Sequence, residues 1–265
     1  MVKCIALGPG AMGYFIFLGV LSKLRQTGEL ADLEEISGAS AGGLLALLFL
    51  LARGDTEKIL DYSLNVQVKN IMKPSIRTFL KSYGLVSIAK IRKVFSESCE
   101  HFTGKKDMTF RELYEWNPIK LYISAYCVDL VKTVYFSVDS TPTMSVLDAV
   151  CATCAVPFLF EPLHLPDGWR YADGATAESS PCGPFLNRKN DVLAVLFEWS
   201  SEMAEIRDLK TYALSILSLT MSLRHGYEVR AHRMPISSKD AFDFAASQDD
   251  KLRMFLTGFS QAIVQ

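Results

Sequence analysis

Ser40 stands in the pattern Gly38-x-Ser40-x-Gly42, in which every neighbouring residue is glycine, alanine or serine. This pattern is typical of a nucleophile elbow, a sharp turn from a strand into a helix that strains the backbone of its serine and admits only small neighbours. Such a turn places the serine at the amino end of the helix, where free backbone N–H groups favour developing negative charge. The pattern therefore favours a catalytic serine. The alternative is a tight turn whose serine is merely solvated.

A second glycine pattern, Gly8-Pro9-Gly10-Ala11-Met12-Gly13, also follows an apolar run and opens a helical pattern. It matches the dinucleotide-binding fingerprint, which further requires an acidic residue at the carboxyl end of the second strand. That position carries Gly38-Ala39-Ser40 instead, so the contact to a ribose is missing. The other interpretation is an oxyanion hole, because glycines let backbone N–H groups approach a substrate carbonyl. Gly10 and Ala11 are the preferred donors, since Pro9 has no N–H.

A catalytic serine needs a base, and Asp173 is the stronger candidate. It follows a short apolar run and precedes Gly174 and other small residues, so its carboxylate could reach a shared cleft. A partly desolvated carboxylate within hydrogen-bond reach can accept the serine proton directly; the simpler interpretation is an Asp-Gly turn. A Ser-His-Asp triad remains the alternative, for which the chain offers four histidines: His101, His164, His225 and His232. None of them lies beside a motif.

Apolar runs and helical patterns predict the elements that position these groups. Strands are expected at 4–7, 33–38, 121–128, 133–138, 169–172 and 192–197, and helices at 14–26, 41–53, 56–64 and 145–153. Strand–helix alternation early in the chain predicts an α/β layer fold with a central sheet. Because ligands collect at the carboxyl ends of parallel strands, the loop 8–13 is expected beside Ser40.

The remaining segments have a mostly helical pattern. Residues 65–118 predict a helical cover over the core, and Asp55 is expected to cap the helix at 56–64. After Trp199 the chain is expected to turn helical to its end, with one helix at 208–223, a looser polar stretch after it, and a second helix from about residue 240. The apolar helix at 14–24 is expected to belong to the core.

Charge and cysteine content exclude several classes of function. The chain has 28 basic and 29 acidic residues, so it has no basic excess and nucleic acid is not expected as a partner. Six scattered cysteines show no disulfide framework and predict reduced, buried thiols in a cytoplasmic protein. Cys151-x-x-Cys154 has the spacing of a zinc half-site or a redox motif. No second pair accompanies it, so we expect it to be packed in the core.

The apolar segments predict neither a signal peptide nor a transmembrane helix. Gly8-Pro9-Gly10 interrupts the apolar start of the chain, and the uncharged runs at 44–52 and 213–223 are too short to cross a bilayer. We therefore expect a cytoplasmic protein that can be peripheral at membranes. The sequence carries no signal for its oligomeric state.

Four motifs in order resemble the patatin-like phospholipase family. They are Gly-x-Gly-x-x-Gly at 8–13, Gly-x-Ser-x-Gly at 38–42, the segment Ala152-Thr153-Cys154-Ala155-Val156-Pro157-Phe158-Leu159-Phe160-Glu161-Pro162, and Asp-Gly-Ala at 173–175. The resemblance spans roughly residues 3 to 200. It implies a three-layer α/β/α sandwich with a mainly parallel central sheet. The acyl hydrolase core would be residues 1–200, and 201–265 would be a helical part of the same domain.

The resemblance also implies a Ser-Asp dyad without a histidine. Ser40 would be the nucleophile, Asp173 its base, and the loop with Gly8, Gly10, Ala11 and Gly13 the source of oxyanion donors. Ser40 would attack an ester carbonyl and form an acyl-enzyme, which water activated by Asp173 would then hydrolyse. No cofactor or metal is required. The implied substrate is a lipid ester, met in transient contact with a membrane or a lipid droplet.

Two positions depart from the family's pattern. Many members carry a basic residue near the end of the glycine loop, whereas Pro9 and Met12 occupy those places here. This loop shape is closer to the branch that includes adipose triglyceride lipase, so phospholipase A-type and triacylglycerol lipase-type activity are both open. The alternatives are a catalytically weak lipid-binding protein on the same fold and a Ser-His-Asp esterase. Intact Ser40 and Asp173 argue against the first.

Overall fold

The computed structural model describes residues 2–199 and 227–262. Their main feature is an eight-stranded sheet in the order β10 (Arg230–Ile236), β9 (Val192–Trp199), β1 (Cys4–Leu7), β2 (Glu35–Ala39), β4 (Lys120–Cys127), β8 (Arg170–Asp173) and β7 (Leu163–His164), with β5 (Lys132–Ser137) also paired to β4. The strands from β10 to β4 are parallel, and β5, β7 and β8 join by antiparallel pairing. The predicted α/β fold with a mainly parallel sheet is confirmed.

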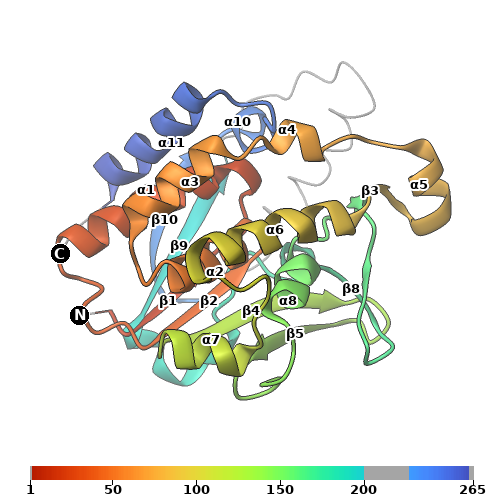
Figure 1. Ribbon diagram of the computed structural model, residues 1–265. Helices are drawn as coiled ribbons and strands as arrows, with labels where there is room; N and C mark the ends of the chain where they lie inside the picture. The colour runs from red at the N-terminus through yellow and green to blue at the C-terminus, as the bar shows by residue number, and fades with distance from the viewer. Residues whose placement is uncertain (1, 200–226, 263–265) are drawn as a thin grey trace.

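The helices lie mostly in one layer over this sheet (Figure 1). They are α1 (Tyr14–Gln26), α2 (Ala41–Leu51), α3 (Thr56–Asn65), α4 (Val68–Ile71), α5 (Ile76–Ser82), α6 (Ile88–Thr103), α7 (Phe110–Trp116), α8 (Val146–Thr153), α10 (Ser238–Ala241) and α11 (Gln248–Gln261). Three 3-10 segments occur at η1 (Ala11–Gly13), η2 (Gly174–Thr176) and η3 (Gly183–Asp191), and β3 (Gly84–Val86) pairs with β6 (Phe158–Phe160) in a second, small sheet.

Strand β1 shows how the two faces of the sheet are covered. Its side chains alternate, so Ile5 and Leu7 belong to the large core cluster that also contains the buried faces of α1 and α2. Cys4 and Ala6 belong to a smaller cluster on the other face, together with Phe185 of η3. Within the described residues the second face therefore has only a thin cover.

Helix α1 is core, as predicted. Phe17, Leu18, Leu21 and Leu24 are completely buried, and burying each such side chain stabilises the fold by about 1.5–3 kcal/mol. No helix in the described part of the chain is long and apolar enough to span a membrane.

Several local predictions hold and one fails. The Asp55 carboxylate caps α3 by accepting the Lys58 N–H at 3.1 Å, and all six cysteines are free thiols. The segment 65–118 is mostly helical but also contains β3. The prediction of a loose polar stretch before residue 240 is wrong, because β10 forms there and extends the sheet in parallel with β9. The helix predicted from about residue 240 is present as α10 and α11. The predicted helix at 208–223 lies outside the described residues.

Helix α11 packs closely on α1 through two glycines. A Cβ atom on Gly19 of α1 would lie 2.0 Å from the Phe255 carbonyl oxygen, and one on Gly258 of α11 would lie 1.9 Å from the Ile16 carbonyl oxygen. Real Cβ atoms do not approach backbone this closely. The C-terminal segment is therefore fitted to the first helix of the chain.

Candidate active site

Ser40 lies between β2 and α2 with a strained backbone. Its φ of 54° and ψ of −127° fall in a region that residues with a side chain rarely occupy, at a typical energetic cost of about 1–3 kcal/mol. The turn closes so tightly that a Cβ on Gly42 would lie 2.2 Å from the Leu7 carbonyl oxygen, and one on Gly38 2.5 Å from the Gly42 carbonyl oxygen. The strand, turn and helix predicted from the glycine–serine pattern are all present.

Asp173 lies at the end of β8 and faces this turn. The Ser40 Oγ donates a hydrogen bond of 2.6 Å to Asp173 Oδ2, across 133 positions of sequence. The other carboxylate oxygen, Oδ1, accepts the Ala175 N–H at 2.8 Å. Asp173 is only 1% exposed and Ser40 only 6%. The structure thus brings together the two residues that the sequence selected as nucleophile and base.

The electrostatic setting of Asp173 suits proton transfer near neutral pH. Burial raises the pKa of its carboxyl from 3.8 to about 7, and the hydrogen bonds from Ser40 and Ala175 oppose that rise. A general base is most effective when its pKa lies near the working pH. An ionised Asp173 can accept the Ser40 proton, and once protonated it can return that proton to a leaving group.

Sequence reasoning missed two side chains that position this pair, those of Thr153 and Glu178. Thr153 Oγ1 accepts the backbone N–H of Ser40 at 2.8 Å, at the end of α8. Two residues later the Ala155 carbonyl accepts the Asp173 N–H at 2.9 Å. Thr153 lies inside the segment 152–162 that carried part of the family resemblance, and that was the available signal. Both members of the pair are therefore anchored to one short stretch of chain.

Glu178 is the second missed residue. Its buried carboxylate accepts hydrogen bonds from the hydroxyl groups of Ser124, at 2.5 Å, and Tyr135. The Glu178 N–H also donates to the Gly174 carbonyl, 3.2 Å away, in the turn that follows Asp173. These contacts tie that turn to β4 and β5.

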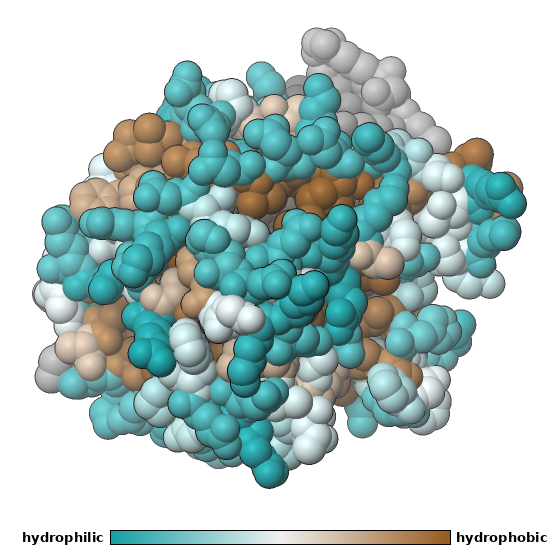
Figure 2. All heavy atoms as spheres, in the orientation of Figure 1, coloured by the Kyte–Doolittle hydropathy of each residue, from teal (hydrophilic) through white to brown (hydrophobic). Residues whose placement is uncertain are grey.

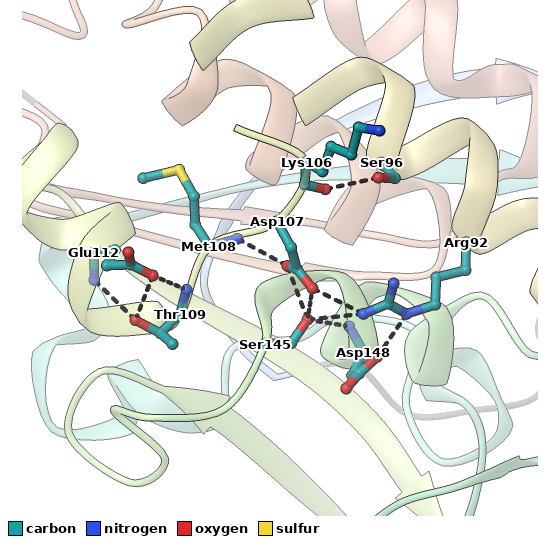
Figure 3. A network of polar contacts seen from close by, with 9 residues as sticks. All are labelled: Arg92, Ser96, Lys106, Asp107, Met108, Thr109, Glu112, Ser145 and Asp148. Carbon is teal, nitrogen blue, oxygen red and sulfur yellow. Dashed lines mark hydrogen bonds and ion pairs between the residues drawn. The ribbon is translucent and has the colours of Figure 1, made fainter. Parts of the chain in front are cut away.

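A polar network fixes the opposite end of α8 (Figure 3). Arg92 of α6 donates to Asp148 Oδ1 at 2.9 Å and to Asp107 Oδ2 at 2.8 Å. The Ser145 hydroxyl donates to Asp107 and accepts the Asp148 N–H at 3.2 Å, which caps the helix. Helix α8 is thus held to α6 at its start and to Ser40 at its end.

The glycine loop offers fewer donors than predicted. The Gly8 N–H donates to the Val195 carbonyl at 2.9 Å, and the Gly13 N–H donates to the Gly10 carbonyl at 2.8 Å. Both groups are already satisfied within the fold, so the prediction that they stabilise an oxyanion is corrected. The N–H groups of Gly10 and Ala11, the donors preferred from the sequence, have no hydrogen-bond partner among the described residues.

An apolar cavity of about 190 Å³ opens beside Ser40 and Ala11. Its walls come from α2, α3, α4, α6 and the C-terminal segment, and they include Leu44, Leu48, Ile71, Met72, Ile91, Val94, Phe95, Val156, Phe242 and Phe244. The polar groups in the lining are engaged with other protein groups: Ser63 Oγ with the Tyr14 hydroxyl at 2.8 Å, and Ser98 Oγ with the Tyr62 hydroxyl at 3.0 Å. The cavity suits a hydrocarbon chain whose polar end stops near Ser40.

The hydrogen bonds made by Ser40 Oγ and the Asp173 carboxylate involve no histidine of the described chain. His101 of α6 packs against Tyr62 of α3, with ring centroids 4.7 Å apart. His164 and His232 lie in β7 and β10. His225 lies outside the described residues. The geometry gives the triad alternative no support.

Comparisons with known proteins identify the family and the fold. Residues 5–186 match the family model described as patatin-like phospholipase. The chain is similar to the probable lipid hydrolase 463L of Invertebrate iridescent virus 6, with 25% identity over 195 residues, 71% of this chain and 66% of the relative. It is also similar to the triacylglycerol lipase ptl3 of Schizosaccharomyces pombe, with 28% identity over 169 residues, 59% of this chain and 33% of that protein. The chain thus spans less than two thirds of either relative.

Solved structures show the same fold. VipD from Legionella pneumophila matches 98% of this chain and 66% of its own with a TM-score of 0.58 and 16% identity. The type III effector protein ExoU matches 98% of this chain and 52% of its own with a TM-score of 0.52 and 15% identity.

Proposed function

The chain belongs to the patatin-like phospholipase family, and from that premise we propose that it is a serine carboxylic ester hydrolase that releases fatty acids from lipid esters. The observation that carries the proposal is the 2.6 Å hydrogen bond from Ser40 Oγ to Asp173, a buried carboxylate whose pKa is raised to about 7. The apolar cavity beside this pair supports an acyl chain as the bound group.

The proposed reaction has two halves. Ser40 Oγ attacks the ester carbonyl carbon while Asp173 accepts its proton, and the N–H groups of Gly10 and Ala11 stabilise the oxyanion. The intermediate then expels the alcohol, which takes the proton from Asp173 and leaves an acyl group on Ser40. In the second half a water molecule gives its proton to Asp173 and attacks the acyl carbon. The fatty acid leaves, and the proton returns to Ser40.

The acyl part of the substrate is better supported than its head group. The cavity is apolar, and the glycine loop has Pro9 and Met12 where a basic residue would favour a phosphate. One similar protein is named as a triacylglycerol lipase. We therefore keep neutral lipid beside phospholipid as a proposed substrate, in line with the loop's likeness to the adipose triglyceride lipase branch. Comparing fatty acid release from triolein and from phosphatidylcholine separates the two.

Residues 1–200 and 201–265 are proposed to form one domain. Strand β10 pairs along its whole length with β9, and the glycines of α1 and α11 allow those helices to touch backbone to backbone. A chain ending at residue 199 is then expected to be unfolded by circular dichroism. A well-folded truncated chain would show instead that the first part is independent.

The first test is labelling with a fluorophosphonate probe, which reacts with activated serines. Wild-type protein is expected to label and Ser40→Ala protein is not, with both showing the same circular dichroism. Labelling of both proteins would place the reactive serine elsewhere. Folded wild-type protein that does not label would contradict the hydrolase proposal and favour a lipid-binding protein on the same fold.

A further inference from the structure

Helix α5 turns large apolar side chains to solvent. Ile76 and Leu80, four residues apart on one face, are 70% and 76% exposed, and Tyr83, which follows the helix, is 67% exposed. Phe158 of β6, whose partner in β3 is Gly84, adds another side chain that is 71% exposed. Single exposed apolar residues are common, whereas several gathered on one projection indicate a binding surface. We call these four residues the α5 apolar patch.

Basic residues flank the patch. Arg77 and Lys81 lie four residues apart in α5, one position after the apolar stripe, so they line the adjacent face of the helix, and Lys73 lies just before the helix begins at Ile76. Between Asp61 and Glu97 the chain has no acidic residue, and its basic residues there are Lys69, Lys73, Arg77, Lys81, Lys90, Arg92 and Lys93. Arg92 and Lys93 have carboxylate partners. Lys73, Arg77 and Lys81 make no ion pair within the described residues.

The patch is joined to the apolar cavity through residues next to it in the chain. Helix α4, directly before α5, contributes Ile71 to the cavity, and Phe158 is followed by Leu159 and Phe160, which also line it. In Figure 1, α5 projects at the right-hand edge of the molecule, beyond α4. Figure 2 shows brown and teal side chains next to each other on that edge. A surface that touched α5 would therefore meet the cavity side of the molecule.

We propose that α5 and Phe158 dock this protein on the surface of an anionic phospholipid bilayer. Exposed apolar side chains beside Lys and Arg are the pattern that binds such surfaces: the apolar groups enter the acyl boundary while the cations meet the head groups. The charges argue against a second copy of the chain as the occupant, because two basic faces repel. The proposal rests on the proposed function only in that docking would bring lipid esters to the cavity.

The test uses Ser40→Ala protein, which binds without hydrolysing the lipid, and vesicle co-sedimentation. Vesicles of phosphatidylcholine with phosphatidylserine are expected to bind the protein, with binding falling as NaCl is added, and vesicles of phosphatidylcholine alone are expected to bind far less. Equal binding to both vesicles would overturn the proposal. So would binding only to an acidic polymer such as polyglutamate or RNA.

Two sets of substitutions, in α5 and at Lys73 just before it, locate the contact. K73Q/R77Q/K81Q is expected to lower the partition coefficient about 100-fold, because each cation near an anionic surface contributes about fivefold. The matched control K106Q/K132Q/K189Q removes the same charge from exposed lysines elsewhere and is expected to have a much smaller effect. I76S/L80S is expected to lower binding about tenfold, whereas L252S/L256S on α11, also exposed, is not. Equal losses in variants and controls would overturn the assignment to α5.

A soluble, monomeric p-nitrophenyl ester separates docking from catalysis. When the same α5 substitutions are made in protein that retains Ser40, the variants are expected to hydrolyse the soluble ester as wild type does. They are expected to lose activity on anionic vesicles. If the protein binds vesicles through α5 but hydrolyses no ester, the docking proposal holds and the proposed function is wrong. Wild-type vesicle binding in the α5 variants would defeat docking and leave the proposed function intact.

Discussion

The two glycine turns, 8–13 and 38–42, follow neighbouring strands and look alike in sequence, yet their glycines answer different needs. A Cβ on Gly42 would strike backbone atoms of Leu7 and Gly8, at 2.2 and 2.5 Å. A Cβ on Gly10 would strike the ring of Phe197, 2.0 Å away. Backbone atoms of a central strand cannot move to make room for a methyl group, whereas a side chain can be replaced by a smaller one. The glycine at 42 is therefore required by the backbone of β1, and the glycine at 10 by the ring of Phe197.

The second turn, with Ser40, is expected to carry out the reaction, so substituting its catalytic residues should have the largest effect on activity. Ser40→Ala should abolish ester hydrolysis, and Asp173→Asn should lower kcat by about 10⁴-fold, as loss of a member of a catalytic set does in other serine hydrolases. Fatty acid release and circular dichroism measure activity and folding separately. Near-normal activity in folded Asp173→Asn protein would remove Asp173 from the mechanism.

Substituting the glycines tests the comparison itself. Gly42→Ala is expected to cost several kcal/mol of unfolding free energy, on the order of 3 kcal/mol or more, because the new methyl group meets backbone. Gly10→Ala should also destabilise, but adding Phe197→Leu to Gly10→Ala should recover most of that loss. Denaturant unfolding measures both effects. If Gly42→Ala proved as stable as wild type, or the double variant recovered nothing, the two turns would not differ in this way.

Thr153, at the end of α8, tests how far the second turn depends on the hydrogen bond that anchors Ser40. Thr153→Val keeps the shape of the side chain and removes the acceptor for the Ser40 N–H. A buried donor without a partner costs about 1–3 kcal/mol, and we expect kcat to fall about 10–100-fold with a small change in KM. Thr153→Ser is the control, since it retains the hydroxyl and should restore activity. A stability loss of equal size in both variants, with kcat unchanged, would leave Thr153 a purely structural role.

The smallest effect is a change with pH. Since only ionised Asp173 can accept the serine proton, kcat/KM should rise about tenfold per pH unit up to a pH of about 7 and then level off. A soluble ester avoids changes in lipid packing across this range. A plateau that begins near pH 4 would mean that Asp173 keeps the ordinary pKa of an aspartate.

The elbow could be predicted because its signals are local, whereas Asp173 was selected with the help of the order of the family motifs. The elbow and the strand before it follow from small residues and apolar runs that need no knowledge of the rest of the chain. The partner of the Gly8 N–H could not be predicted, because it depends on β9 lying next to β1. Thr153 was missed because its contact with Ser40 spans 113 positions and no local pattern marks the threonine hydroxyl as the acceptor for that N–H.

Strand β10 was missed because of its composition. Its residues Arg-Ala-His-Arg-Met-Pro-Ile carry charges and a proline, which a central strand would exclude. At the end of the described sheet, β10 forms backbone hydrogen bonds with only one neighbouring strand, β9. Proline and charged side chains are tolerated at such a position. A search of the sequence for apolar runs typical of buried strands therefore does not detect β10.

The burial of Asp173 also links the protonation of the site to the stability of the whole fold. Between pH 3.8, the ordinary pKa of an aspartate, and about pH 7, its value here, the folded protein holds a proton that the unfolded chain has released. Folding then takes up a proton, and stability falls as the pH rises through this window, by on the order of 4 kcal/mol in total. Activity and stability should therefore move in opposite directions with pH.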